Sequence, residues 1–266
     1  MKGVDKSDTQ EDKVPEASSF SKEELMHRRL FAFLAVLLFP GLLFAGLPAR
    51  FHDIAQVGDG GGFRTVFLIE NQNAQAATVT LRFFKDDGSP LSLNVGGGDG
   101  VSFTTVIPPG GMKKVATAGV AAAPQVGWAQ LSSTVEVGAE VLFELFSSGR
   151  LVAQAAVESP GPVDLFDLFV DQADGGSTGV ALANLSAVGS VRILFVLRDE
   201  NGVERASRTI SLPALGHVAQ FVSELFPASA GLRGTLHVEA SGPVTVVALQ
   251  QTGGVLATLP VVEIFS

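Results

Sequence analysis

Thr-Val-Thr-Leu-Arg-Phe-Phe-Lys-Asp-Asp-Gly-Ser-Pro, residues 78–90, is the stretch that decides the fold. Its apolar residues Val79, Leu81 and Phe83 fall at every second position, with polar residues between them. A period of two places alternate side chains on opposite faces, which is typical of a β-strand with one buried face. Asp87-Gly88 then supplies residues that tolerate the positive φ of a tight turn. The stretch therefore predicts a half-buried strand that ends in a hairpin-type turn.

The same order of elements occurs twice in the chain. A glycine-rich stretch ends in Asn71 and its counterpart ends in Asn184, and each is followed by an alternating strand with an acidic turn, a Pro-containing segment and two further strands. The matching stretches are 59–71 with 174–184, 78–90 with 190–204, 107–115 with 212–220, 126–133 with 232–241, and 140–146 with 244–251. An ordered repeat at an offset of about 105–115 residues indicates duplication of one structural unit, with chance similarity between two β-rich halves as the alternative.

Several short strands, with turn signals about every ten residues, favour a β-sandwich or barrel over a βαβ fold. We therefore predict an all-β chain of two tandem immunoglobulin-like antiparallel β-sandwich domains, residues 50–160 and 161–266. The boundary is expected at Ser159-Pro-Gly-Pro162. One short helix is expected at residues 217–226, with one side formed by Val218, Phe221 and Leu225.

Several motifs in the first repeat resemble sequences found in other proteins. They are Phe-x-x-Ile-Ala…Asp-Gly-Gly-Gly-Phe-x-Thr…Asn in 51–71, Phe-Phe-x-Asp-Asp-Gly-Ser-Pro-Leu in 83–91, Ile-Pro-Pro-Gly-Gly in 107–111 and Val-Gly-Trp-Ala in 126–129. In this combination they resemble uncharacterised tandem β-sandwich repeats of secreted bacterial proteins. The second repeat lacks the Trp and the double proline, so the resemblance is clearer in the first. It implies export and a β-sandwich, and it implies no catalytic residues.

The amino-terminal part has the layout of a secretory signal or a membrane anchor. Arg28-Arg29 precede an almost wholly apolar run, which ends in Gly46-Leu47-Pro48-Ala49. We divide this part into a disordered tail with a basic flank, residues 1–29, and a signal h-region or anchor, residues 30–49. The basic pair favours retention of the tail in the cytoplasm and export of the rest. An extracytoplasmic protein is expected: secreted, periplasmic or at the cell surface, with membrane contact only through residues 30–49 if they stay uncleaved.

Cleavage, anchoring and the start of translation stay open. A run of about 18–20 residues at about 1.5 Å per residue only just spans a hydrocarbon core of about 30 Å. Pro40-Gly41 would break a spanning helix, which favours a cleaved signal, although Leu47 is larger than the cleavage site prefers. Translation from Met26 would give a compact signal, whereas translation from Met1 gives a long cytoplasmic tail.

The balance of acidic and basic residues narrows the classes of partner that the chain is expected to bind. Residues 1–49 hold seven of the 27 acidic and six of the 18 basic residues, which leaves 20 acidic and 12 basic residues in 50–266. An acidic surface without clustered Lys and Arg argues against nucleic acid and anionic lipid. The chain has no cysteine, so disulfides, thiolate metal sites and thiol nucleophiles are excluded. The expected partner is an unknown protein or surface polymer.

No catalytic, cofactor-binding or metal-binding residue is assigned from the sequence. His52, His217 and His237 are isolated in the sequence, without metal-site spacing. The acidic groups match no calcium loop and are expected to be solubilising turn and edge residues, although calcium between strands or domains stays open. A carboxylate pair for glycoside hydrolysis has no support. The acidic groups are Asp86-Asp87, Asp164/Asp167/Asp171/Asp174 and Asp199-Glu200.

Three further features have structural interpretations. The runs Gly60–Gly62 and Gly96–Gly98 do not continue as phosphate loops and are expected in turns and bulges. Trp128, within an alternating strand, is expected in the core rather than on a sugar-binding face. Asn184-Leu-Ser186 matches a glycosylation sequon, which means little in a bacterial cell.

These observations favour an exported, non-enzymatic protein with a structural, adhesion or protein-interaction role at the cell envelope. A carbohydrate-binding accessory protein is the alternative. It would need exposed aromatic residues on one sheet face, and the absence of Tyr counts against it. An enzyme of unrecognised type comes third and would need a deep pocket with converging polar groups.

Overall fold

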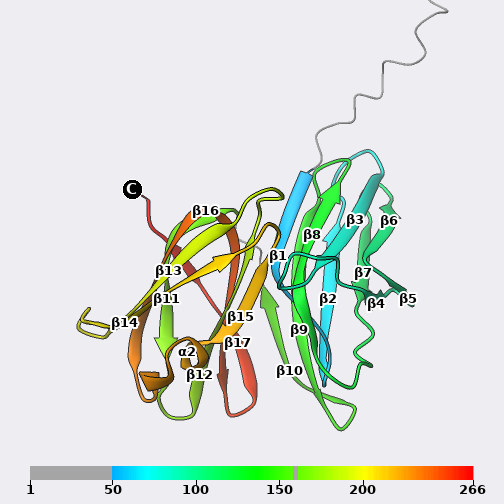
Figure 1. Ribbon diagram of the computed structural model, residues 1–266. Coiled ribbons are helices and arrows are strands. Elements are labelled where there is room, and N and C mark those ends of the chain that lie inside the picture. The colour runs from blue at the N-terminus through cyan, green and yellow to red at the C-terminus, as the bar shows by residue number, and fades with distance from the viewer. Residues whose placement is uncertain (1–49, 158–160, 266) are drawn as a thin grey trace, which may run out of the picture. The chain divides into compact units, whose positions relative to one another are not determined.

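The chain forms two sets of antiparallel strands, one on each side of residues 158–162 (Figure 1). The computed structural model describes residues 50–157 and 161–265. The expected tail, the signal or anchor segment and part of Ser159–Pro162 lie outside these residues. Both sets of strands belong to one compact unit, Gly46–Ser266. Among the described residues, no helix has the length and apolar character needed to cross a membrane.

The first half is a sandwich of two antiparallel layers. One layer has the order β6-β3-β8-β1 and the other the order β7-β2-β9-β10. The layers are joined at the β1–β2 hairpin, where Asp59 pairs with Arg64 and Gly60 with Phe63. The strands are β1 (Arg50–Gly60), β2 (Phe63–Glu70), β3 (Ala77–Phe84), β4 (Leu93–Val95), β5 (Gly98–Gly100), β6 (Ser102–Ile107), β7 (Met112–Ala116), β8 (Gln125–Ser133), β9 (Gly138–Ser147) and β10 (Arg150–Val157).

The second half has the same two-layer plan, with one strand shared between the layers. Residues 234–240 of β16 pair with β13, and residues 244–252 pair with β12, so β16 passes from one layer to the other near Gly242. The layers are β14-β13-β16-β11-β18 and β15-β12-β16-β17. The elements are β11 (Val163–Asp171), β12 (Gly176–Asn184), β13 (Val191–Asp199), β14 (Glu204–Leu212), β15 (His217–Phe221), α2 (Val222–Leu225), a 3₁₀ turn (Pro227–Ser229), β16 (Arg233–Thr252), β17 (Val255–Leu259) and β18 (Val261–Glu263).

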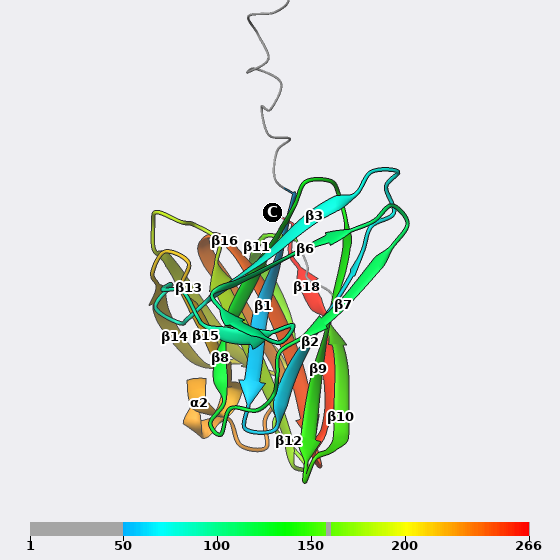
Figure 2. The same cartoon turned by 90° about the vertical axis from the view of Figure 1, so that its right-hand side faces the viewer.

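The two halves share one strand order, apart from the β1–β2 pairing of the first half and the added strand β18 of the second. Strands β1, β2, β3, β6, β7 and β10 occupy the places of β11, β12, β13, β14, β15 and β17, and β8 with β9 occupies the place of β16. The described residues therefore confirm an all-β chain of antiparallel sandwiches, with one strand order used twice. The views in Figures 1 and 2 show the two layers of the first half from perpendicular directions.

The repeat extends to individual hydrogen bonds. Asn71 and Asn184 are fully buried at the ends of β2 and β12. Each side-chain amide donates to three carbonyl groups, two of which belong to the x-Pro pair that closes the following edge strand. The acceptors are Gln75, Ile107 and Pro108 for Asn71, and Gly189, Leu212 and Pro213 for Asn184. The Asn and x-Pro motifs of the sequence repeat thus form one hydrogen-bonded corner in each half.

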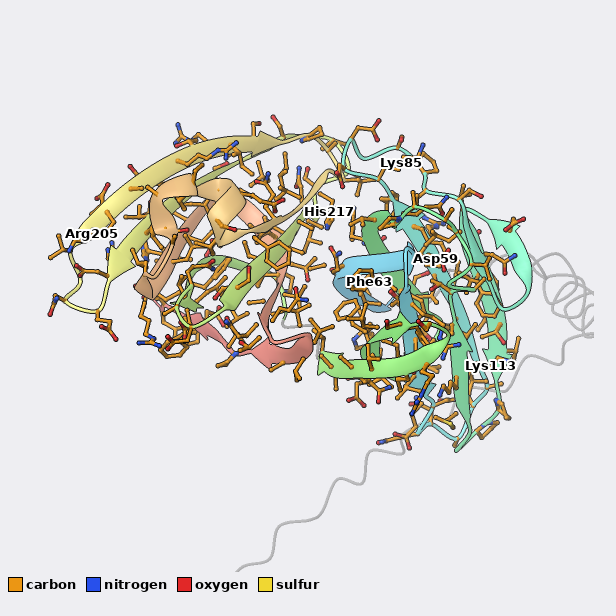
Figure 3. All side chains as sticks on the ribbon, turned by 90° about the horizontal axis from the view of Figure 1, so that it is seen from below. Asp59, Phe63, Lys85, Lys113, Arg205 and His217 are labelled. Atoms are coloured by element: carbon orange, nitrogen blue, oxygen red, sulfur yellow. The ribbon has the colours of Figure 1, made fainter. Side chains whose placement is uncertain are left out.

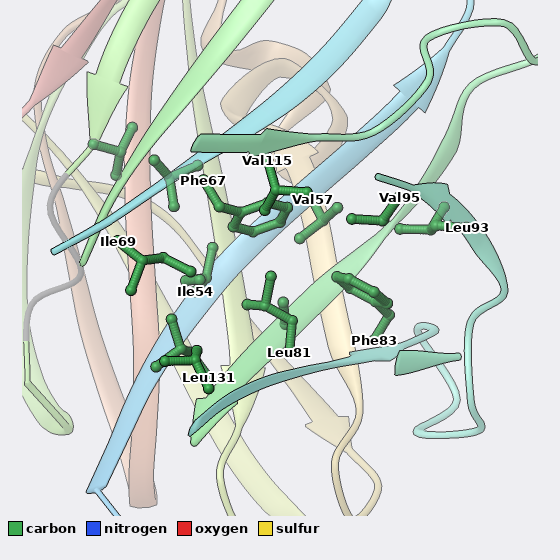
Figure 4. Close-up of a cluster of buried hydrophobic side chains, with 14 of the residues drawn as sticks. Ile54, Val57, Phe67, Ile69, Leu81, Phe83, Leu93, Val95, Val115 and Leu131 are labelled. Atoms are coloured by element: carbon green, nitrogen blue, oxygen red, sulfur yellow. The ribbon is translucent and has the colours of Figure 1, made fainter. Parts of the chain in front are cut away.

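Each half encloses an apolar core. Figure 4 shows the first, which includes Phe67, Leu81 and Phe83 and confirms the alternation predicted for residues 78–84. The second includes Phe166, Leu182, Phe195, Leu236 and Val246. Two residues of the second half pack into the first cluster, so apolar contact continues between the halves. These residues are Ala181 and Val247.

The helix expected at residues 217–226 is wrong over its first part. His217–Phe221 is β15, which pairs with β12 along its whole length, and only Val222–Leu225 is helical. Pairing with β12 satisfies the backbone groups of this segment without a helical turn. Apolar spacing in so short a segment does not distinguish a helix from a buried strand.

Candidate functional site: a groove between the two halves

Trp128 lies where the two halves meet. It projects from the outer face of β8 and is completely buried. Its ring stacks on Phe84, with centroids 4.8 Å apart and planes at 25°. The indole Nε1 donates a 2.7 Å hydrogen bond to the carbonyl oxygen of Leu215, in the β14–β15 turn of the second half. Trp128 is therefore buried as predicted, but in the junction and not in a sandwich core.

A second set of contacts ties the same turn to the first half. His217 is buried, and its Nδ1 lies 2.7 Å from Asp86 Oδ1 while its Nε2 lies 3.1 Å from Gln56 Oε1. The backbone N–H of His217 also donates to the Asp86 carbonyl. Gly88 has positive φ, as predicted, and approaches Ala214 so closely that a Cβ would lie 2.1 Å from its carbonyl oxygen. Figure 3 shows His217 at the junction, near the turn that carries Lys85.

The junction holds open a groove of about 520 Å³ between the halves. This volume falls in the range of about 300–1,000 Å³ found for ligand pockets. The floor on the second half is made of small residues, Gly179, Ala181 and Ala219, from the outer faces of β12 and β15. Because these side chains are small, the sheet leaves space that larger residues would fill.

Aromatic and aliphatic side chains form the groove walls. Phe63 of β2, Phe221 of β15 and Val126 of β8 are each a little over one-third exposed, because each lines the open space. Phe143 and Leu249 line the inner part. Figure 3 shows Phe63 on the side of the first half that faces the second. The arrangement can bury apolar surface of a ligand, which is favourable at about 25 cal/mol per Å².

The charged side chains at the groove rim are engaged in hydrogen bonds. Arg64 Nε donates to Glu144 Oε2 at 2.7 Å, and the guanidinium lies 4.8 Å from the centre of the Phe146 ring. Gln154 donates to the other Glu144 oxygen at 3.2 Å. Glu224 accepts the backbone N–H of Phe221 at 2.7 Å. A rim of this kind provides no unpaired cation for an anionic ligand, so the groove suits an uncharged apolar group.

The histidines are not brought into this groove. His237 lies on the sheet of the second half, with Nδ1 2.7 Å from Asp167 and Nε2 3.2 Å from Glu239. His217 likewise uses both ring nitrogens on side chains, so neither imidazole has a ring nitrogen left to activate a nucleophile. His52 lies on β1. Among the described residues, no three His, Asp or Glu side chains are placed to hold a metal ion.

Several members of the other predicted acidic groups have structural partners. Arg233 pairs with Asp171 and with Asp174, at 3.4 and 2.5 Å. Asp199 accepts from Arg205 and from two backbone N–H groups of its own turn. Asp171, Asp199 and Arg233 line a more open and more polar hollow of about 660 Å³ on the second half. Asp171 and Asp174 are thus paired with Arg233, and Asp199 closes its own turn, whereas a solubilising role for these carboxylates stays a prediction.

The sequon residue Asn184 is fully buried and its amide is committed to three carbonyl groups. It is therefore not available for glycosylation in the folded chain. The glycine runs lie in turns with positive φ at Gly60–Gly62 and at Gly96 and Gly97, as predicted. Gly98 does not have positive φ.

The groove itself was not predicted from the sequence. Its walls come from both halves, and strand alternation says which side chains face outward but not what lies opposite them. The available signal was the outward position of large apolar residues such as Phe63 and Phe221 beside small ones such as Gly179 and Ala219.

Comparison with known proteins adds no family: no protein-family model matches the chain, and no curated protein matches it. The resemblance to secreted tandem β-sandwich repeats therefore stays a prediction.

Proposed function

We propose that this chain is an exported, non-enzymatic recognition protein that binds an apolar side chain or short apolar segment of a partner protein. The observation that carries this proposal is the groove between the halves, with its apolar walls, its small-residue floor and a rim arginine that is paired with Glu144. Interaction or adhesion at the cell envelope is the role that such a groove would serve.

Rigidity supports the proposal. Trp128, His217 and Gly88 each fix the β14–β15 turn against the first half, so the groove is present before a ligand arrives. A preformed site avoids the entropy cost of ordering loops on binding. The titratable residues that line it, Arg64 and Glu224, are both engaged in hydrogen bonds, which supports binding rather than catalysis.

A sugar-binding role has less support. Stacking on sugar rings needs exposed aromatic faces, and the one tryptophan is completely buried. Phe63 and Phe221 come from different halves and line a groove, so they do not form a row on one sheet face. The proposed extracytoplasmic location rests on the sequence of residues 28–49 alone.

The groove is tested by filling it. Gly179 does not have positive φ, and the atoms nearest to a Cβ there would be those of the movable Phe221 ring, at 3.4 Å, and the Leu249 carbonyl oxygen, at 3.9 Å. Gly179→Leu therefore places a side chain in the groove with little backbone strain. Gly98→Leu is the matched control, because Gly98 has no neighbour within 4 Å and lies outside the groove.

The probe is the neutral apolar fluorophore N-phenyl-1-naphthylamine. We expect its emission to rise with the unsubstituted protein and with Gly98→Leu, and its affinity to fall at least about tenfold with Gly179→Leu. A short peptide with a central Phe should displace the probe, whereas the same peptide with Ser in that place should not. Equal probe binding by both variants would refute the groove as the site, and failure of the Phe peptide to compete would refute a protein segment as its ligand.

A further inference from the structure

Strand β6 is an open edge of the first half. It pairs with β3 on one side, and among the described strands none pairs with its other side. Figure 1 shows β6 at the margin of the first half that is remote from the second half, and this side faces the viewer in Figure 2. Ser102, Thr104 and Val106 are exposed, with Val106 62% accessible. The edge is therefore separate from the groove and from the junction.

The strand register shows which backbone groups of β6 point outward. Thr78, opposite Val106, donates its N–H to Thr134 Oγ1, and its carbonyl accepts the Thr134 N–H. Phe83, at the other end of β3, donates to Val101. Hydrogen-bonded and non-bonded pairs alternate along antiparallel strands. The N–H and C=O groups of residues 102, 104 and 106 therefore point away from β3.

The equivalent edge of the second half is protected by charge. Ser207–Leu212 of β14 corresponds in register to Ser102–Ile107 of β6, and Thr209 corresponds to Thr104. Strand β14 carries Glu204, Arg205 and Arg208, whereas β6 carries no charged residue. Charged side chains on an edge strand oppose pairing with another chain. Of two equivalent edges, one is thus protected and the other is not.

The other outer strands in the described part of the chain differ from β6 as well. Strand β7 carries Lys113 and Lys114, and β18 is three residues long and carries Glu263. Strands β10 and β17 lie against each other, with Thr258 donating to the Ala156 carbonyl. Strand β15 lies at the junction. Strand β6 therefore combines length, exposure and lack of charge.

We propose that β6 is a homotypic interface: it pairs antiparallel with β6 of a second copy of this chain. A two-fold axis at Thr104 puts Thr104 opposite Thr104 and Ser102 opposite Val106, so the outward groups meet in register and no like charges face each other. In a second copy, β6 is already held extended by β3. Pairing with it therefore costs less conformational entropy than pairing with a flexible peptide. The contact is small for a dimer interface, so the pairing is weak and depends on concentration.

The experiment uses residues 46–266, because this compact unit contains both cores and every described strand pair. Sedimentation velocity at rising concentration is expected to show a monomer–dimer equilibrium. Amide deuterium exchange should slow with concentration at residues 102, 104 and 106, and not at the equivalent residues 207, 209 and 211. A monomer at every concentration, or exchange that does not change at β6, would overturn the proposal without recourse to any variant.

Charge reversal at the two-fold axis provides the specific test. Thr104→Lys and Thr104→Glu each place like charges directly opposite, so each alone should raise the dissociation constant at least about tenfold. An equal mixture of the two should dimerise again. Thr209→Lys and Thr209→Glu are the matched controls and should leave dimerisation unchanged. Association that survives Thr104→Lys, or that the mixture does not restore, contradicts pairing through β6.

Discussion

Asp53 shows how burial near the junction acts on one side chain. It lies on β1 and is partly buried, and its backbone carbonyl accepts a 3.0 Å hydrogen bond from Thr245 of the second half. Burial raises the pKa of the carboxyl above its ordinary value, and the hydrogen bond from Gln130 and the charge of His52 offset this only in part. The folded state therefore holds the proton of Asp53 to a higher pH than the unfolded state does.

The sign of this shift predicts a pH dependence. Between the ordinary pKa and the raised one, the folded state binds more protons, so the free energy of unfolding falls as pH rises through that window. Asp53→Asn keeps the oxygen that accepts from Gln130 and removes the charge. We expect the variant to lose this decline and to be at least as stable as the unsubstituted chain at neutral pH, measured by urea unfolding across the acid range.

Asp87→Asn is the control, because the pKa of Asp87 is shifted in the direction opposite to that of Asp53. The pKa of Asp87 is lowered, chiefly by hydrogen bonding to Ser89, so its contribution to stability is present above the ordinary pKa and is lost as pH falls through the lowered value. The two variants should therefore change the pH profile in opposite directions. Parallel changes would show that the difference does not come from these two carboxyls.

At the scale of elements, two glycines set how closely the central strands pack. Gly127 of β8 precedes Trp128, which pairs with Phe84, and Gly234 of β16 precedes Thr235, which pairs with Arg198, so the two glycines occupy equivalent places. A Cβ at Gly127 would lie 2.1 Å from the Phe84 carbonyl oxygen, and one at Gly234 would lie 2.0 Å from that of Arg198. The close approach of backbones is thus part of the repeated plan, and no larger residue fits without a shift of the strands.

Gly127→Ala and Gly234→Ala should each lower the free energy of unfolding by about 2–4 kcal/mol, because the strands must separate to admit a methyl group. Gly98→Ala, where nothing lies within 4 Å, should change it by no more than about 0.5 kcal/mol. Urea unfolding monitored by circular dichroism measures all three. If Gly98→Ala lowered the free energy of unfolding as much as Gly127→Ala, the loss of stability would come from backbone flexibility and not from crowding.

These elements also show what the sequence can and cannot predict. Local signals predicted the alternation of 78–84, the turn at Gly88, and the paired Asn71 and Asn184. Short strands with regular turn signals predicted the sandwich, and the ordered repeat predicted that one structural unit is used twice. The strand His217–Phe221 was missed because its pairing with β12 is tertiary, and the groove was missed because its walls depend on how two halves meet.

At the scale of the whole molecule, the junction determines what the protein can bind. Trp128, which was expected in a core, is covered by the carbonyl of Leu215 and by Phe84 instead. The same turn places His217 between Asp86 and Gln56, and Gln56 also lines the groove. The groove therefore exists only while the second half is seated on the first.

The emission of Trp128 and its quenching by acrylamide, measured on residues 46–266, test this arrangement most directly, because the chain has one tryptophan. We predict a blue-shifted emission with little quenching, unchanged by any added polysaccharide, since the second half covers the ring. A red-shifted, easily quenched emission would show that the halves do not meet at Trp128 and that the groove is not formed as described. Protection of such an emission by one polysaccharide would favour sugar binding instead.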